Sequence, residues 1–239
     1  MTEIRTVIPE DIDVYLDSLV RTGPFASKAE LVRAALVAFV STAGPMPRDF
    51  DRENIVAPDG RIYQLEYARE GSMRGSPGVG VAYNGGAVLV GTTSLPSKLE
   101  RKIEKIKRLG HRVAMLISGI VSDARMLENH VRRADPKTTD ELAERLVEFY
   151  WEHTIDRRKR PLCAALLVAS ALGDGVRLLQ FDPSGAVVEA NAAAIGQDNK
   201  RVTEFLEKRY RRGSAEAAER FALEALGKPE SYEIVHVTS

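Results

Sequence analysis

The first forty residues combine an alternating segment with two segments of helical periodicity. Residues 3–8 alternate between two faces and contain several β-branched side chains, which predicts a short strand. Apolar residues at helical spacing then predict a helix that ends at Gly23. Ser27 followed by Glu30 is typical of a capping box, in which the serine caps the helix and the glutamate reaches back. We therefore expect a second helix after Ser27.

A short linker rich in proline and glycine, residues 44–49, separates this segment from a longer one that mixes strands and helices. Two hairpins are predicted, one turning at Asn84-Gly85-Gly86 and one around Gly110. The expected elements are a helix over 61–73, strands over 79–83, 87–90, 103–109 and 112–118, helices over 121–133 and 139–153, strands over 162–171 and 176–181, a short strand pair between the turn 182–185 and residue 195, helices over 200–210 and 215–226, and a strand over 232–237. This order predicts an α+β sandwich of two sheets flanked by helical layers.

Length and charge narrow the class of protein. The chain has 239 residues, and its 34 lysines and arginines balance its 34 aspartates and glutamates. The length suits one to two domains with a substantial core, here residues 1–43 and 50–239. Zero net charge excludes a polycation that binds nucleic acid along its whole length, and it also excludes an acidic disordered chain. No signal peptide or membrane-spanning run is predicted, so we expect a soluble cytoplasmic protein.

Residues that could carry cofactor chemistry are sparse. Cys163 lies in an apolar run, which predicts a buried packing residue in a reducing compartment. The four histidines lack the spacing of metal ligands, and no glycine–lysine motif for phosphate is present. We therefore expect neither a metal nor a cofactor.

The succession of strand, helix, glycine turn and serine-capped helix over residues 3–41 resembles a ribbon-helix-helix domain. In that family two chains pair their strands into a ribbon that enters the DNA major groove, and the N-terminus of the second helix holds a phosphate. The resemblance implies that Arg5 and Val7 would face bases. It also implies that Ser27 and Lys28 would face phosphate.

The charge of the same segment opposes DNA binding. Residues 1–44 contain four basic and six acidic residues, whereas nonspecific DNA affinity arises mostly from neutralised phosphates. Of the outward-facing strand residues Glu3, Arg5 and Val7, Arg5 alone is suited to reading base edges. Forty residues with this much apolar surface seldom fold alone, so dimerisation is expected. The segment is interpreted either as a dimerisation module or as a DNA-binding unit.

Several separated blocks of the second part resemble archaeal-type proteasome α-subunits. The blocks, in order, are 58–70 (PDGRIYQLEYARE), 103–106, 118–125, 182–185, 194–196 and 202–207. The resemblance spans about residues 50–238. It implies the four-layer αββα fold of N-terminal-nucleophile hydrolases. It also implies a seven-membered ring that caps the proteolytic rings of β-subunits.

The resemblance implies that this chain is not itself a peptidase. The related β-subunits use an N-terminal threonine, whose free amine acts as the base, together with a lysine and an acid. Here the nucleophile position falls near Ser76, in the interior of the chain and before a proline. The acid position falls near Thr92, which has no carboxylate, so Lys105 alone is retained. A self-processing hydrolase stays a further hypothesis for function, beside the two that are stated at the end of this section.

A pocket for an activator is the first feature that the resemblance carries over. In the family, a lysine between neighbouring α-subunits pairs with the carboxylate that ends the tail of an unfolding ATPase. Lys105 matches that lysine, and Gly119, Ile120 and Glu66 match other residues of the pocket. An ammonium in a partly desolvated groove binds a terminal carboxylate better than an exposed ammonium does. The alternative is that Lys105 is one more charge in the basic run 98–108.

A gate at the pore is the second feature. Phe50, Asp51 and Arg52 match the family's Tyr-Asp-Arg, although Phe50 lacks the hydroxyl group. Pro58 and Tyr67 match residues that organise the open gate. A folded N-terminal segment replaces the ordinary tail, and Asp51 and Arg52 can alternatively form a local ion pair and cap.

Two functions from different classes follow. The first is a non-catalytic α-type subunit of a proteasome core or core-like ring, which binds β-subunits, other α-subunits and an ATPase activator. The second is a ribbon-helix-helix regulator that binds DNA and uses a vestigial proteasomal fold for oligomerisation. Arg157-Arg-Lys-Arg-Pro161, which replaces the family's Gly-Gly-Val-Arg-Pro, is interpreted either as a solvated loop or as a contact for acidic partners or nucleic acid.

Overall fold

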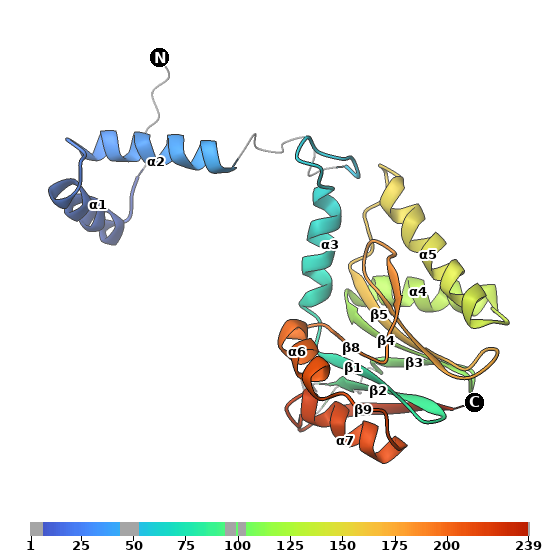
Figure 1. Ribbon diagram of the computed structural model, residues 1–239. Helices are drawn as coiled ribbons and strands as arrows, with labels where there is room; N and C mark the ends of the chain where they lie inside the picture. Colours follow the sequence, from blue (N-terminus) through green and yellow to red (C-terminus); the bar gives the residue numbers. More distant parts are fainter. Residues whose placement is uncertain (1–6, 44–52, 94–98, 100–103, 239) are drawn as a thin grey trace. The chain divides into compact units, whose positions relative to one another are not determined.

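The computed structural model describes residues 7–43, 53–93, 99 and 104–238, and the chain separates into two compact units, Met1–Arg48 and Asp49–Ser239 (Figure 1). The first unit contains α1 (Glu10–Thr22) and α2 (Lys28–Ala43). Most of the strand predicted over 3–8 lies outside the described residues, and Val7 and Ile8 are not in a strand. The predictions for Arg5, Phe50, Asp51 and Arg52 also lie outside the described residues.

The predicted serine cap at the start of α2 is present. The backbone N–H of Glu30 donates to Ser27 Oγ over 3.2 Å. The Glu30 carboxylate accepts from the N–H of Ala26 over 2.8 Å, one residue before the cap itself. The first bond satisfies an N–H group that the helix start leaves unpaired, and the second ties the residue before the cap to the first turn of the helix.

The second unit holds two antiparallel sheets and five helices among its described residues. Its elements are α3 (Tyr63–Met73), β1 (Gly78–Tyr83), β2 (Gly86–Thr92), β3 (Ile106–Leu109), β4 (Val113–Gly119), α4 (Val121–Ala134), α5 (Thr139–Ile155), β5 (Ala164–Ser170), β6 (Arg177–Phe181), β7 (Val187–Glu189), β8 (Ala192–Ile195), α6 (Asn199–Arg209), α7 (Ala215–Ala225) and β9 (Tyr232–Thr238). The strand orders are β8-β1-β2-β9 and β3-β4-β5-β6-β7. Both predicted hairpins form, as β1–β2 and β3–β4.

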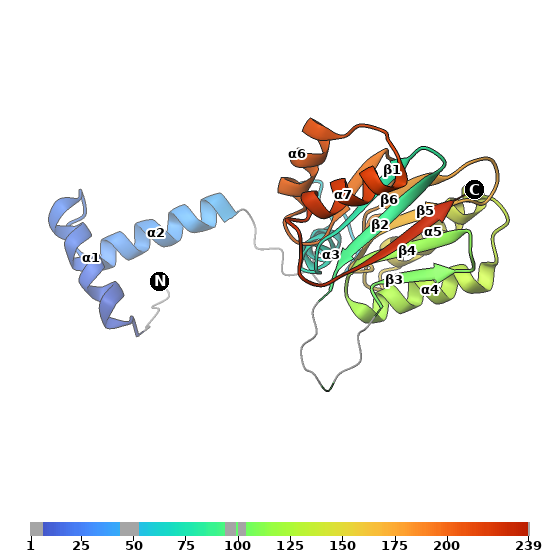
Figure 2. The ribbon, with the colours of Figure 1, turned by 90° about the horizontal axis from the view of Figure 1, so that it is seen from below.

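Three clusters of apolar side chains lie between the layers of the second unit. The layers themselves can be followed in the ribbon (Figures 1 and 2). Leu127 of α4 and Leu146 of α5 pack on the outer face of the five-stranded sheet. Leu89 and Leu116 belong to the layer between the two sheets. On the far side, the outer face of the four-stranded sheet packs against α6 and α7, with Ala222 fully buried. The sequence of layers is therefore helices, sheet, sheet, helices, which confirms the predicted αββα sandwich.

Both short strands predicted between residue 185 and residue 195 are present, but they do not pair with each other. β7 pairs with β6 in the five-stranded sheet, whereas β8 pairs with β1 in the four-stranded sheet. All three residues of β7 are exposed, and β8 is largely buried. The chain therefore crosses from one sheet to the other between Glu189 and Ala192. The apolar residues of β8 are buried in the four-stranded sheet, which favours this crossing.

The helix expected over 61–73 begins two residues later, at Tyr63. Asp59 accounts for the delay, since its carboxylate accepts from the N–H of Arg61 over 3.1 Å and from the Tyr63 phenol over 2.6 Å. The phenol hydrogen bond lowers the pKa of Asp59 and raises that of Tyr63. These contacts hold residues 59–61 in a turn rather than a helix.

Candidate functional site

Lys105 lies directly before β3, and its ammonium is surrounded by oxygens from the loop between α3 and β1. Lys105 Nζ donates to Ser76 Oγ over 2.7 Å, to the carbonyl oxygen of Pro77 over 2.9 Å and to the carbonyl oxygen of Ser76. Gly91 leaves room for the lysine stem, because a Cβ there would lie 3.0 Å from Lys105 Cδ. Burial lowers the pKa of Lys105 to about 7, so its charge changes near neutral pH.

Gly119, at the end of β4, has a backbone that other residues seldom adopt. Its φ is +130°, and a Cβ there would overlap the carbonyl oxygen of Cys163, the residue directly before the neighbouring strand β5. The next residue, Ile120, donates its N–H to that same carbonyl over 2.9 Å, and its side chain is 43% exposed. The bond fixes the direction in which the chain leaves β4 for α4.

One loop joins these two features. Gly75 packs against Ser118 and Gly119 so closely that a Cβ at position 75 would lie 2.6 Å from the N–H nitrogen of Gly119. The next two residues of that loop carry the oxygens that hold Lys105. The loop 75–77 therefore contacts both Lys105 and Gly119, and Ile120 follows Gly119 directly in the chain.

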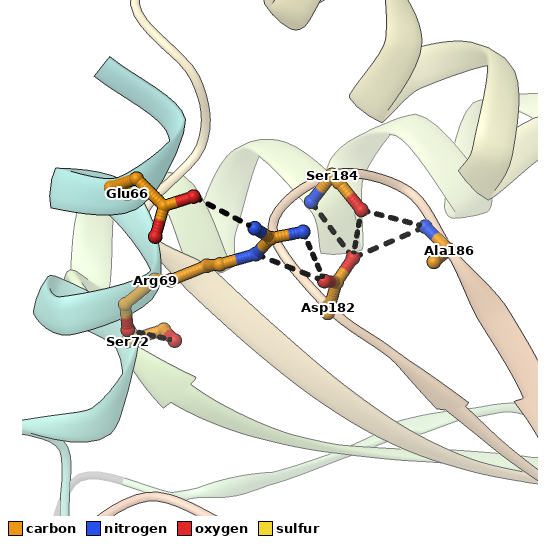
Figure 3. A network of polar contacts seen from close by, with 6 residues as sticks. All are labelled: Glu66, Arg69, Ser72, Asp182, Ser184 and Ala186. Carbon is orange, nitrogen blue, oxygen red and sulfur yellow. Dashed lines mark hydrogen bonds and ion pairs between the residues drawn. The ribbon is translucent and has the colours of Figure 1, made fainter. Parts of the chain in front are cut away.

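Glu66, the fourth residue predicted for the pocket, is directed elsewhere in the same chain. It lies on α3, and its Oε1 pairs with Arg69 Nη1 at 3.2 Å. Arg69 in turn donates through Nε and Nη2 to Asp182 Oδ2, each over 3.2 Å (Figure 3). The other oxygen of Asp182 accepts from the N–H of Ser184 and from that of Ala186. This network joins α3 to the turn between β6 and β7.

We expect Arg69→Met to lower the free energy of unfolding of the chain by about 1 kcal/mol, because both charged partners are partly exposed and solvent weakens the pair. Side-chain exposures of 40% for Arg69 and 38% for Asp182 support this modest value. Urea unfolding followed by circular dichroism measures the change. Arg145→Met removes the exposed helical pair with Glu148 and should cost less than about 0.5 kcal/mol. Equal losses in the two variants would contradict a role for Arg69 in joining α3 to the turn.

A nearly buried ion pair supports the backbone beside Gly119. The Asp123 carboxylate, only 1% exposed, accepts from Arg160 Nη1 and Nη2 over 2.7 and 2.6 Å and from the N–H of Cys163 over 2.8 Å. Burial alone would raise the pKa of Asp123, but the hydrogen bonds from Arg160 and Cys163 hold it below its usual value. Asp123 thus fixes the backbone of Cys163, whose carbonyl oxygen lies beside Gly119.

The basic cluster 157–160 is largely engaged within the chain. Besides Arg160, Arg158 pairs with Asp156 at 3.4 Å and Lys159 pairs with Glu152 at 3.6 Å. The four residues are nevertheless exposed, as expected for a solvated loop. Contact with an acidic partner or nucleic acid stays an untested interpretation.

Two of the predicted gate residues are described, and both are exposed. Pro58 lies in the turn that Asp59 stabilises, and Tyr67 lies on α3 with 52% of its surface exposed. Cys163, expected to be buried, is half-buried, and burial raises the pKa of its thiol. Its backbone, rather than its thiol, takes part in the arrangement around Gly119.

Comparison with known proteins identifies the family. A family model described as "Proteasome subunit" matches residues 72–231. The chain belongs to the proteasome subunit family. It is 37% identical over 174 residues to "Proteasome subunit alpha" of Archaeoglobus fulgidus, which covers 68% of this chain and 70% of that protein. The protein of the same name from Methanocaldococcus jannaschii is 37% identical over 177 residues, covering 69% and 68%. "Proteasome subunit alpha 2" of Haloarcula marismortui is 35% identical over 184 residues, covering 72% and 75%.

These relatives confirm the resemblance to α-type proteasome subunits. The region matched by the family model begins in α3 and ends just before β9, so it contains the loop 75–77, Lys105 and Gly119. Within the described part of the chain, no helix is long and apolar enough to cross a membrane, and no group of three or more potential ligands could hold a metal ion. The matched residues do not include the first unit.

In the first unit, Lys28 interacts with acidic residues of its own chain. Lys28 Nζ lies 2.8 Å from Asp13 Oδ1 and 2.9 Å from Asp17 Oδ2, both on α1. Hydrogen bonds to these carboxylates raise the pKa of Lys28. Two negative charges therefore already surround the residue that was predicted to face a phosphate, and this arrangement opposes such a contact. The same two carboxylates had contributed to the segment's negative charge in the sequence.

Proposed function

We propose that this protein is a non-catalytic α-type subunit of a proteasome core or core-like ring, assembled with β-subunits and with other α-type chains. The observation that carries the proposal is its similarity to archaeal α-subunits over about two thirds of its length. The geometry around Ser76 supports the absence of peptidase activity. Ser76 lies between α3 and β1 in the chain. Thr92, near which the resemblance puts the acid position, has no carboxylate, and its hydroxyl donates to the Pro77 carbonyl over 3.0 Å.

Co-expression with a β-subunit tests this assembly. We expect the two chains to co-purify as a particle of several hundred kilodaltons, measured by size-exclusion chromatography with light scattering. The chain expressed alone is the control. A 26.3 kDa chain that stays solitary in the presence of the β-subunit would contradict the proposal. A free dimer that shifts DNA in a gel would favour the regulator hypothesis instead.

The same proposal assigns Lys105, Gly119 and Ile120 to a pocket that receives the C-terminal carboxylate of an ATPase activator. The support is that one loop contacts both Lys105 and Gly119, the residue before Ile120, and that the Lys105 ammonium is partly withdrawn from water. Because Glu66 is paired with Arg69, it contributes through the position of α3 rather than through contact with Lys105 in the same chain. The exposed Pro58 and Tyr67 are proposed to act at the gate.

For the first unit we propose pairing with a second copy of the chain. Leu31 is the one buried hydrophobic residue among its described side chains, so the unit has almost no core of its own. Several large apolar side chains are about half exposed or more, namely Val7, Ile12, Val14, Tyr15, Leu36, Val37 and Phe39. Pairing on a seven-membered ring would leave one copy unpaired, unless two rings meet face to face.

We expect Leu36→Glu in the full chain to abolish this pairing, because a carboxylate would then be buried in an apolar interface. Light scattering of the isolated chain should change from the mass of a dimer to that of a monomer. Val188→Glu is the matched control, since Val188 is also exposed but lies on the second unit. A dimer that survives the substitution at Leu36 would show that the pairing surface lies elsewhere.

A further inference from the structure

One carboxylate connects the edges of the two sheets beside Lys105. Glu233 lies on β9, the edge strand of the four-stranded sheet, and Lys105 directly precedes β3, the edge strand of the five-stranded sheet. Glu233 Oε2 accepts from the N–H of Lys105 over 2.8 Å and from the N–H of Ile106 over 3.0 Å. A single side-chain oxygen therefore satisfies two consecutive N–H groups where the chain enters β3.

We infer that Glu233 positions Lys105 through its two backbone hydrogen bonds and also keeps the lysine side chain charged through its own negative charge. It holds the backbone of residues 105 and 106, and the lysine side chain extends from this fixed point to the oxygens of Ser76 and Pro77. The loop therefore binds the ammonium of Lys105, and Glu233 of β9 binds its backbone. This inference rests on the proposed role of Lys105 in binding a tail carboxylate.

The charge of Glu233 also acts on the ammonium. Burial lowers the pKa of Lys105 to about 7, and the negative charge of Glu233 opposes this effect. Near neutral pH, the fraction of Lys105 that is charged therefore depends on Glu233. A polar groove of about 430 Å³ adjoins the site, and its charged lining residues are Glu104, Lys107, Arg108, Glu128, Arg132 and Glu233.

Four of the other charged residues of this groove form two ion pairs within it. Glu128 pairs with Arg132 at 2.8 Å, and Glu104, with a side chain 76% exposed, lies 3.8 Å from Lys107. Arg132 additionally donates to the carbonyl of Arg108 over 2.9 Å. Glu233 is therefore the carboxylate of the lining whose bonds reach the Lys105 backbone, and Glu104 is a suitable control for the loss of a nearby charge.

The test measures the acetylation rate of Lys105 by mass spectrometry in the full-length chain, from about pH 5 to about pH 9. Glu233→Gln keeps an oxygen that can accept the two N–H groups but removes the charge. We expect it to move the midpoint of the pH profile down by roughly half a unit or more. Glu233→Asp keeps the charge and should stay close to the wild-type midpoint, and Glu104→Gln should leave the midpoint unchanged. An unshifted midpoint in Glu233→Gln, or equal shifts in Glu233→Gln and Glu104→Gln, would overturn the inference.

A second measurement links the inference to function. The probe is a fluorescent decapeptide with the C-terminal sequence of the cognate ATPase, compared with the same peptide carrying a C-terminal amide. At about pH 7.5, Glu233→Gln should weaken binding of the free-acid peptide by roughly threefold, because fewer Lys105 side chains are charged. Equal binding of both peptides to the wild type would contradict the proposed pocket. The acetylation profile would still decide whether the charge of Glu233 acts on Lys105.

Discussion

Alanine at position 119 should lower the free energy of unfolding by about 4 kcal/mol or more, or prevent folding of the second unit. Two costs combine there. The φ of +130° is strained for any residue with a Cβ, and the added carbon would overlap the carbonyl oxygen of Cys163. That carbonyl cannot move away cheaply, because it accepts the N–H of Ile120 and the adjoining backbone is bound to Asp123. A typical domain is stable by only about 5–15 kcal/mol, so the loss is a large fraction of the total.

Gly110→Ala separates the two costs of the change at Gly119. Gly110 also has a positive φ, +72°, but nothing lies within 4 Å of the position that a Cβ would take. Its replacement should therefore cost only about 1 kcal/mol, the conformational part alone. Urea unfolding of both variants, followed by circular dichroism, gives the difference. Equal losses at positions 110 and 119 would show that the contact with Cys163 is not the source of the destabilisation.

Local patterns predicted most of the fold of the second unit. Asn84-Gly85-Gly86 marked the first hairpin correctly, because Gly85 takes the positive φ that such a turn needs. The failure at β7 and β8 has a different cause. Each is only three or four residues long, so periodicity carries little information, and the sheet that each joins is decided by distant partners. The hairpin is specified by neighbouring residues, whereas the crossover is specified by tertiary contacts.

The candidate site could be predicted only where a family block covered it. Lys105 and Gly119 lie in such blocks, but Glu233 is 128 residues from Lys105 in the chain and belongs to no recognised motif. Arg160 was assigned to a basic cluster, although its guanidinium is bound to Asp123, which is 37 residues earlier. Hydrogen bonds between distant segments leave no periodic signal in the sequence.

The predicted phosphate contact of Lys28 in the first unit also depends on tertiary contacts. By resemblance Lys28 takes the family position for a phosphate contact, and in the sequence the acidic residues of α1 contribute only to the net charge of the segment. The helical hairpin brings Asp13 and Asp17 to the Lys28 ammonium, so the same residues act as its specific partners. The net charge of the segment predicts weak binding of polyanions, but it cannot show which basic residue is already paired.

Lys105→Ala should reduce stimulation of peptide hydrolysis by the ATPase tail by about tenfold or more in the assembled particle, while leaving assembly intact. The substitution removes a charge-assisted interaction with the tail carboxylate, and interactions of this kind contribute about 1.5–3 kcal/mol. The measurement compares hydrolysis of a fluorogenic peptide with and without the tail peptide. Lys107→Ala is the matched control, since Lys107 lies two residues away and pairs at 3.8 Å with Glu104. Undiminished stimulation in the Lys105 variant would contradict the assignment of the pocket.

The pH dependence of tail binding gives the same assignment an independent test. Burial places the pKa of Lys105 at about 7, so the ammonium is present below that pH and is lost above it. The tail carboxylate is ionised above about pH 4, so affinity should be highest between about pH 5 and 6.5 and should fall by up to tenfold per pH unit above 7. An ordinary exposed lysine would instead keep its charge to about pH 10. Tail affinity that stays constant from about pH 6 to pH 9 would therefore mean that the tail is held by another cation, even if the Lys105→Ala variant were impaired for structural reasons.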